Sequence, residues 1–152
     1  VGPAVADPVL LRKLTIGKQA TDVHTSTLSQ AIVDAFLRAG VLEGHIERSN
    51  ELYITKKNAM QQAIRDFFPK GVKYTDPDGG LFIWAELPEG MNALELLEDS
   101  IKKNVAFIPG EHFFVGGIGK NTMRLNFSNS SCDNIVKGIS ILGKCIAEKG
   151  DL

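Results

Sequence analysis

Hydrophobic positions in the first forty residues recur every three or four residues and predict two helices. Asp7 and Pro8 are typical of a helix start, as N-cap and first helical residue. A second helix is expected after the hydroxyl-rich stretch 25–27, which supplies a cap, and it ends at Gly40, which tolerates the left-handed conformation of a helix end. The apolar residues on the two helices are Leu10, Leu11, Leu14, Leu28, Ile32, Phe36 and Leu37.

One apolar stripe runs from about Leu42 to Phe68 and predicts a long third helix, which Pro69 ends. A helix of about 25 residues is close to 40 Å long, at about 1.5 Å per residue. Because this length exceeds the width of one small domain, we expect a connector between two domains. The stripe consists of Ile46, Tyr53, Met60, Ile64 and Phe67.

After residue 71 the pattern changes to the alternation that is typical of strands. The stretches 72–75 and 81–87 are separated by a cluster of turn-forming residues and predict a hairpin. Two further strands are expected at 105–109 and 121–128, with a glycine-rich loop between them.

Two helices accompany these strands in the sequence. Asn92 is a cap for the first, with Glu95 in the reciprocal position of a capping box. Leu94, Leu97 and Ile101 are expected to face inward from it. The second helix starts at Ser130 or Ser131, and its apolar face consists of Ile135, Ile139, Leu142 and Ile146.

This order of elements predicts an α+β fold, with a mostly antiparallel sheet of about four strands and helices on one face. The short turns within each strand pair favour antiparallel pairing. The expected organisation is a helical remnant of a different domain at 1–41, a long connecting helix at 42–71 and a small α+β domain at 72–152.

Composition changes this picture little and excludes several classes of function. The 152 residues are 43% hydrophobic and 23% charged with a net charge of −1, as in an ordinary globular protein, and no basic run suggests nucleic acid. No apolar run is long enough to span a bilayer. Cys132 and Cys145 lack metal or redox spacing, and no signal-peptide pattern is present. We therefore expect reduced thiols and a cytoplasmic location.

The sequence does not match the common patterns of metal, phosphate-binding or nucleophilic sites. His24, His45 and His112 are too far apart in sequence for a metal site, which needs three or four close ligands. The stretch 116–120 ends in Gly-Lys, but no Ser or Thr follows the lysine and a strand comes next, so a turn is favoured over a phosphate loop. No Gly-x-Ser-x-Gly elbow is present, and Cys132, although it precedes a helix, is more typical of a small buried residue.

Arg124 is the strongest candidate for binding chemistry. It alternates with Met123, Leu125 and Phe127, so it faces away from the apolar side of its strand. A guanidinium on a rigid strand can bind a carboxylate through two parallel hydrogen bonds, a geometry that lysine cannot reproduce. A solvated arginine or a structural ion pair is the alternative interpretation.

Four sequence blocks follow one another along the chain: 18–25 (KQATDVHT), 78–84 (DGGLFIW), 105–110 (VAFIPG) and 123–128 (MRLNFS). In this order and at similar spacing they resemble the pyridoxal-phosphate-dependent aminotransferases of fold type I. The similarity is greatest to the 2-aminoadipate and multi-substrate branch of class I/II, and it covers essentially the whole chain.

This resemblance implies a role for five residues. In the family, the arginine that matches Arg124 binds the α-carboxylate of an amino-acid substrate, and the second substrate is a 2-oxo acid. Phe82 and Phe113 match positions that face the substrate side chain in some members, and the segment around Val23 and His24 resembles one that reaches the neighbouring subunit's site in a homodimer. Ordinary packing is the alternative for these last four residues.

The resemblance also implies what this chain does not carry. The family's Schiff-base lysine motif, and the Asp, Tyr and Asn that hold the cofactor, have no match here and are expected before Val1. We therefore expect pyridoxal phosphate in a longer parent, and neither covalent cofactor nor transamination in this chain alone. Two alternatives stay open: an effector-sensing aminotransferase-like domain of a winged-helix transcriptional regulator, and a stand-alone binding or dimerisation module.

Overall fold

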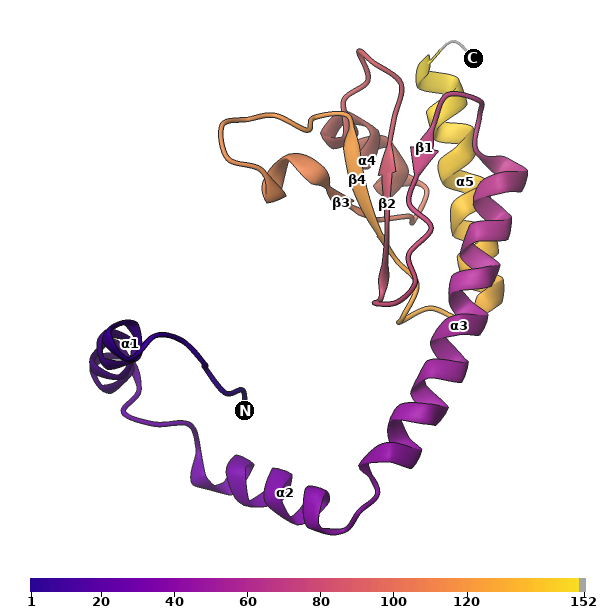
Figure 1. The fold of residues 1–152 in the computed structure, drawn as a ribbon. Coiled ribbons are helices and arrows are strands. Elements are labelled where there is room, and N and C mark those ends of the chain that lie inside the picture. Colours follow the sequence, from indigo (N-terminus) through magenta and orange to yellow (C-terminus); the bar gives the residue numbers. More distant parts are fainter. Residues whose placement is uncertain (151–152) are drawn as a thin grey trace. The chain divides into compact units, whose positions relative to one another are not determined.

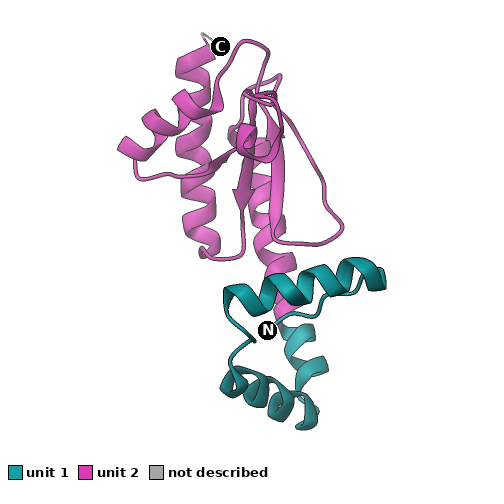
Figure 2. Ribbon diagram, turned by 90° about the vertical axis from the view of Figure 1, so that its left-hand side faces the viewer, with its two compact units in different colours: residues 1–48 teal, residues 49–152 magenta. Residues whose placement is uncertain are grey.

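The computed structural model describes residues 1–150, and its elements follow the predicted order (Figure 1). The chain divides into two compact units, 1–48 and 49–152 (Figure 2). The division falls inside the long helix α3 (Leu42–Phe67), whose existence and length match the prediction.

The first unit is helical. Helix α1 (Pro8–Thr21) begins as predicted, with Asp7 accepting a hydrogen bond of 2.8 Å from the backbone N–H of Val9. Helix α2 (Thr27–Arg38) is capped by Ser26, and the chain turns after it at Gly40, where φ is +66°. Neither α1 nor α2 has a buried residue.

The second unit contains a four-stranded antiparallel sheet in the order β1-β2-β4-β3. Its strands are β1 (Lys73–Tyr74), β2 (Phe82–Glu86), β3 (Ile108–Pro109) and β4 (Thr122–Asn126). In the two central strands, Trp84 is paired with Arg124, and Ile108 of β3 lies on the other side of Arg124. The α+β fold with an antiparallel sheet is therefore confirmed.

The helices of the second unit lie on one face of this sheet (Figure 1). Ile83 and Ala85 of β2 and Met123 and Leu125 of β4 point to that face and are buried. They pack in one core with α4 (Ala93–Lys102), α5 (Cys132–Gly150) and the second half of α3. Because side chains alternate along a strand, Phe82, Trp84 and Arg124 point to the opposite, open face. The helix residues of the core are Met60, Ala63, Ile64, Ala93, Leu96, Ile135, Ile139, Leu142, Cys145 and Ile146.

The predicted inner face of α4 was wrong for two of its three residues, while the third, Leu97, is partly buried and packs against the core as predicted. Leu94 and Ile101 are 40% and 54% exposed, whereas Ala93, Leu96 and Ser100 are buried. The helix is rotated so that the small residues Ala93 and Ser100, together with Leu96, face the core. Asn92 caps it by accepting from the N–H of Leu94, but Glu95 lies 3.9 Å from Lys149 instead of completing a capping box.

Strand β3 is shorter than the predicted strand 105–109. The N–H of Val105 donates to the carbonyl of Ser100 at the end of α4, so it is not available to a sheet partner. Pro109 has no N–H to donate. Only Ile108 and Pro109 therefore pair with β4.

Candidate functional site

Arg124 lies at the middle of β4, between Trp84 and Ile108 on the open face of the sheet. Strands β2 and β3 pair with β4 on its two sides, so the side chain of Arg124 projects from a rigid backbone. Arg124 is half-buried, between the extremes of a core residue and a solvated surface cation.

Two aromatic rings enclose the guanidinium of Arg124. Its central carbon lies 4.0 Å from the centre of the Phe82 ring and 4.5 Å from the centre of the Phe113 ring. Both distances are within the range of cation–π attraction. The predicted residues Arg124, Phe82 and Phe113 are thus brought together, from β2, β4 and the loop after β3.

The Nε atom of this guanidinium has no hydrogen-bond partner among residues 1–150. The Nε atom is buried and makes no hydrogen bond, and no ion pair of Arg124 is found within residues 1–150. A buried donor without a partner costs about 1–3 kcal/mol. An arginine in this state has its hydrogen-bonding capacity available for an anion, and a planar carboxylate matches its fork.

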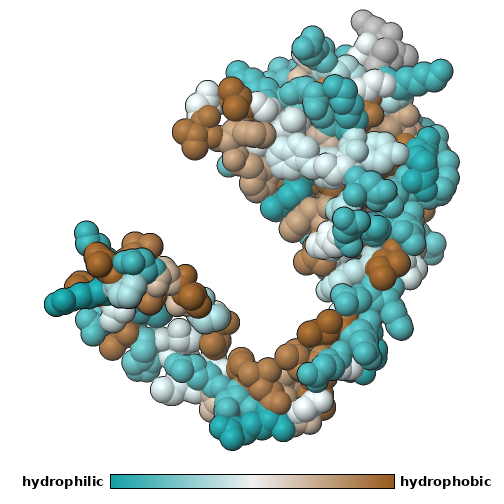
Figure 3. Space-filling view, viewed as in Figure 1, coloured by the Kyte–Doolittle hydropathy of each residue, from teal (hydrophilic) through white to brown (hydrophobic). Residues whose placement is uncertain are grey.

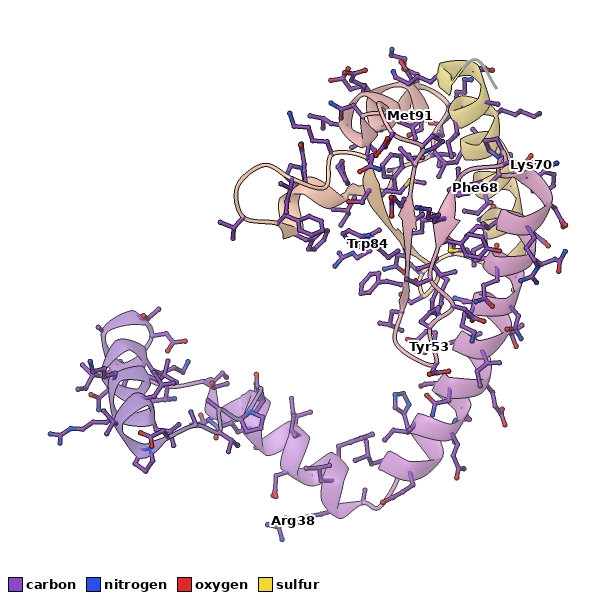
Figure 4. The ribbon with its side chains drawn as sticks, turned by 45° about the horizontal axis from the view of Figure 1, so that its top comes forward. Arg38, Tyr53, Phe68, Lys70, Trp84 and Met91 are labelled. Carbon is purple, nitrogen blue, oxygen red and sulfur yellow. The ribbon has the colours of Figure 1, made fainter. Side chains whose placement is uncertain are left out.

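Trp84 and Phe114 extend this arrangement, and we refer to Phe82, Trp84, Phe113 and Phe114 as the aromatic cluster. The Trp84 ring meets Phe113 edge to face at 5.7 Å and 73°, and meets Phe114 at 6.0 Å and 71°. Figure 4 shows Trp84 on the side of the sheet where the loop 110–119 lies. Edge-to-face geometry is the favoured arrangement of aromatic pairs, so each ring restrains its neighbour.

The loop 110–119 has two positions, Gly110 and Gly119, where neighbouring side chains leave no room for a Cβ atom. A Cβ on Gly110 would approach Trp84 Cζ2 and Thr122 Cβ to 2.8 Å each, and a Cβ on Gly119 would overlap the Phe114 ring. The segment starts as a short 3₁₀ helix, η1 (Gly110–Phe113), and leads into a strand, in agreement with the predicted turn. Its apolar side chains gather at the surface (Figure 3), where Val115 is 97% exposed.

Val23 and His24 lie in the first unit, between α1 and α2. Val23 is exposed and has a φ of +65°, which is unusual for a β-branched residue and is a strained backbone conformation. The Nδ1 atom of His24 is 2.8 Å from the carbonyl oxygen of Thr25. Their predicted contact with substrate stays a prediction.

Sequence reasoning missed Trp84 and Phe114 as parts of the site. Trp84 could have been found, because it is two residues after Phe82 on the same strand and therefore shares its face. Phe114 could not, because its position depends on the backbone of a glycine-rich loop whose φ angles the sequence does not specify.

These residues suit a carboxylate better than a covalently held cofactor. The aromatic cluster and Arg124 comprise one guanidinium and four rings, so they contain no amine for a Schiff base and no carboxylate for a pyridine nitrogen. Within residues 1–150, no group of three His, Cys, Asp or Glu side chains is placed to hold a metal ion. In the same range, no helix is both long and apolar enough to cross a membrane.

Fold and site together define a small α+β domain whose open sheet face presents a caged arginine. No protein-family model matches the chain. Individual proteins do match, and several of them are aminotransferases.

Aromatic-amino-acid aminotransferase 1 of Thermococcus litoralis is 43% identical over 149 residues, which cover 98% of this chain and 36% of that protein. The crystal structure of a multiple substrate aminotransferase from Thermococcus profundus has a TM-score of 0.89 at 40% identity, over 96% of this chain and 36% of that one. The crystal structure of the α-aminoadipate aminotransferase of Thermus thermophilus, in complex with N-(5'-phosphopyridoxyl)-L-leucine, has a TM-score of 0.88 at 39% identity. The match covers 95% of this chain and 37% of that one.

The resemblance to fold-type I aminotransferases is thereby confirmed over almost the whole chain, and the chain spans about a third of the length of the curated relatives it matches. A more distant similarity concerns regulators. An uncharacterised HTH-type transcriptional regulator of Escherichia coli, YdcR, is 28% identical over 82% of this chain and 26% of its own length.

Proposed function

We propose that this chain is the substrate-carboxylate-binding part of a pyridoxal-phosphate-dependent aminotransferase, an enzyme that transfers an amino group between an amino acid and a 2-oxo acid. Arg124 binds the α-carboxylate. The single observation that supports this role is the guanidinium between Phe82 and Phe113, whose buried Nε has no partner.

The geometry explains why an arginine is suited to this task. Both rings lie within cation–π distance of the guanidinium carbon, and neither offers it a conventional hydrogen-bond acceptor, so its N–H groups remain for a ligand that approaches its edge. A carboxylate bound through two parallel hydrogen bonds cannot rotate, and both substrates of an aminotransferase carry an α-carboxylate. Arg124 would therefore orient the substrate without taking part in proton transfer.

The cofactor belongs to other parts of the proposed enzyme. Because the site contains no amine or carboxylate suited to pyridoxal phosphate, we propose that this chain alone neither holds the cofactor covalently nor transaminates. The complete enzyme would be a homodimer, in which Val23 and His24 reach the site of the partner subunit and Phe82 and Phe113 face the substrate side chain.

The carboxylate role can be tested on the purified chain, because Trp84 is its single tryptophan and contacts Phe113. Butyrate is titrated while Trp84 fluorescence is recorded, with butyramide as a neutral ligand of the same shape. We expect saturable binding of butyrate alone, weakened about tenfold by Arg124→Lys, since a point charge replaces a bidentate fork. Equal responses to butyrate and butyramide, or an unchanged titration in Arg124→Lys, would contradict the proposal.

Covalent cofactor binding is tested separately. The chain is incubated with pyridoxal phosphate, reduced with borohydride and digested for mass spectrometry. We expect no single lysine to carry the pyridoxyl group stoichiometrically. Labelling of one specific lysine would show that the chain does hold the cofactor.

A second candidate is the effector-sensing domain of a transcriptional regulator, which the similarity to YdcR supports. In that case Arg124 would bind the same carboxylate without turnover. The experiment is to assay a full-length protein containing this chain for transamination and for DNA binding that changes with an amino acid. Turnover without DNA binding favours the enzyme, and ligand-dependent DNA binding without turnover favours the regulator.

A further inference from the structure

A continuous series of ring contacts connects Arg124 to a glycine in the adjoining loop. The Phe113 ring lies over Arg124, Trp84 meets the edges of both Phe113 and Phe114, and Phe114 rests against Gly119. Neither Phe114 nor Gly119 is among the rings that contact the guanidinium of Arg124 directly, which are Phe82 and Phe113.

We propose that Phe114, seated on Gly119, is a positioning residue that holds Phe113 over Arg124 and so sets the orientation of the guanidinium for an anion. The proposal rests on the proposed function only in the choice of a carboxylate as the anion. Nothing in the carboxylate-binding role of Arg124 by itself requires Phe114 or Gly119.

The local backbone explains why Phe113 needs this support. Phe113 ends a 3₁₀ helix of four residues and is 49% exposed, so the short helix by itself does not fix its side chain. Trp84 is fixed better, because it lies on β2 and packs against Gly110. Trp84 therefore restrains Phe113, and Phe114 makes a second edge-to-face contact with the Trp84 ring.

Gly119 is what allows Phe114 to occupy that place. Its φ is +77°, and an added Cβ would overlap Cδ2 and Cε2 of the Phe114 ring. The neighbouring Gly117 has a similar φ of +72°, but nothing lies within 4 Å of where its Cβ would be. The two glycines share the same backbone strain on substitution and differ in the contact with Phe114.

This pair gives a matched test on the full chain. In Gly119→Ala, Phe114 must move, so we expect butyrate binding about three- to tenfold weaker, the loss that goes with one aromatic contact, and altered Trp84 emission. Gly117→Ala carries the same strained φ and is expected to keep both the affinity and the emission. Equal losses in the two variants would mean that loop strain alone is responsible and would overturn the proposal.

Phe114 itself provides the second pair of variants. Phe114→Leu removes the ring and is expected to weaken butyrate binding and to alter Trp84 emission, as Gly119→Ala does. Phe114→Tyr keeps the ring and is expected to bind butyrate as the wild type does. A Phe114→Leu chain that is folded, by its circular dichroism, and binds butyrate normally would show that Phe114 has no positioning role.

A ligand-independent measurement separates this proposal from the proposed function. Because the Phe82 and Phe113 rings lie 4.0 and 4.5 Å from the guanidinium carbon, we expect their ring currents to shift the NMR resonance of the Arg124 Nε–H group, so that the shift reports whether the rings are in place. We expect it to change in Gly119→Ala and Phe114→Leu and to persist in Gly117→Ala. If these shifts behave as expected but the wild-type chain binds no butyrate, the positioning role stands and the carboxylate function fails. An unchanged shift in both variants overturns the positioning role whatever the chain binds.

Discussion

The guanidinium carbon of Arg124 lies 4.0 Å from the centre of the Phe82 ring, with Phe113 at 4.5 Å as a second aromatic neighbour. These rings do not neutralise the positive charge, unlike an ion pair with Asp or Glu. They attract the cation while leaving its N–H donors unpaired. Arg124 is therefore held in place by groups that do not compete with a carboxylate for its hydrogen bonds.

Removal of the Phe82 ring should weaken anion binding without unfolding the protein. A cation–π contact at a partly exposed site contributes about 0.5–1 kcal/mol, so we expect Phe82→Leu to bind butyrate about two- to fivefold more weakly. Phe82 is 37% exposed, and the thermal midpoint should change little. The comparison uses Trp84 fluorescence for binding and circular dichroism for melting, and unaltered butyrate affinity would contradict the role of the ring.

Two glycines of α5 should respond in opposite ways to alanine. A Cβ on Gly143 would overlap the carbonyl oxygen of Phe67 at the end of α3, so we expect Gly143→Ala to destabilise the protein by about 1–3 kcal/mol. Gly138 has open space around it, and Gly138→Ala should stabilise the same helix by about 0.5–1 kcal/mol.

Urea unfolding of both variants provides the measurement. The two substitutions add the same methyl group to the same helix, so a difference in sign isolates the contact with Phe67. Equal and favourable changes at both positions would show that α3 and α5 can separate there at little cost.

The ion pairs of Asp99 should make stability depend on acid pH. Lys149 donates a hydrogen bond to Asp99 at 2.7 Å, and Lys102 donates another at 2.9 Å. These hydrogen bonds lower the pKa of Asp99 from 3.8 to about 2, and the bond from Lys149 has the larger effect. A depressed folded-state pKa gives stability that is present above the unfolded pKa and is lost on protonation. The contribution should therefore disappear as the pH falls from about 4 to about 2.

The measurement is the thermal midpoint of the wild type and Asp99→Asn across this range. The wild type should melt higher above pH 4, and the difference should shrink toward pH 2 and in high salt, because the pair is exposed to solvent. Asp99 also raises the pKa of Lys149, so the same contribution is lost at strongly alkaline pH, as Lys149 loses its proton. A constant difference from pH 2 to pH 5 would argue against the ion pair.

A hydrogen bond of Gln61 should contribute to the attachment of the hairpin to α3. Gln61 is 7% exposed and donates to the carboxylate of Asp76 at 2.5 Å, in the turn between β1 and β2. We expect Gln61→Leu to cost about 1 kcal/mol of unfolding free energy, as for a typical single hydrogen bond. Its neighbour Gln62, which bonds only within α3 to Asp66 and Arg65, is the matched control.

The comparison is made by urea unfolding of Gln61→Leu and Gln62→Leu. Gln62→Leu should lie within about 0.5 kcal/mol of the wild type, as surface substitutions usually do. Indistinguishable unfolding curves for the two variants would show that the bond to Asp76 adds no net stability.

Much of the fold could be predicted from local patterns. The period of α3, the alternation of β4 and the cap of α1 are properties of neighbouring residues, so sequence spacing reports them directly. The same alternation predicted that Arg124 faces away from Met123 and Leu125, and these two residues are buried on the other face.

The inner face of α4 could not be predicted in this way. Two helical stripes, one with Leu94 and Ile101 and one with Ala93 and Ser100, have equivalent spacing, and hydrophobicity favours the wrong one. The choice depends on how closely the helix approaches the sheet, which is a property of the packed core. The aromatic cluster escaped prediction for a related reason, since it joins residues from two strands and a glycine-rich loop.

The pairing of Trp84 with Arg124 has a consequence for folding. A shift of β4 by one residue would exchange Arg124 with Met123 or Leu125 and would bury a guanidinium in the core. An unpaired buried charge is among the most costly defects in a protein interior. The cation proposed to recognise substrate therefore also favours the correct alignment of the central strands. A chain with the wrong register would be destabilised because Arg124 would be buried without a partner.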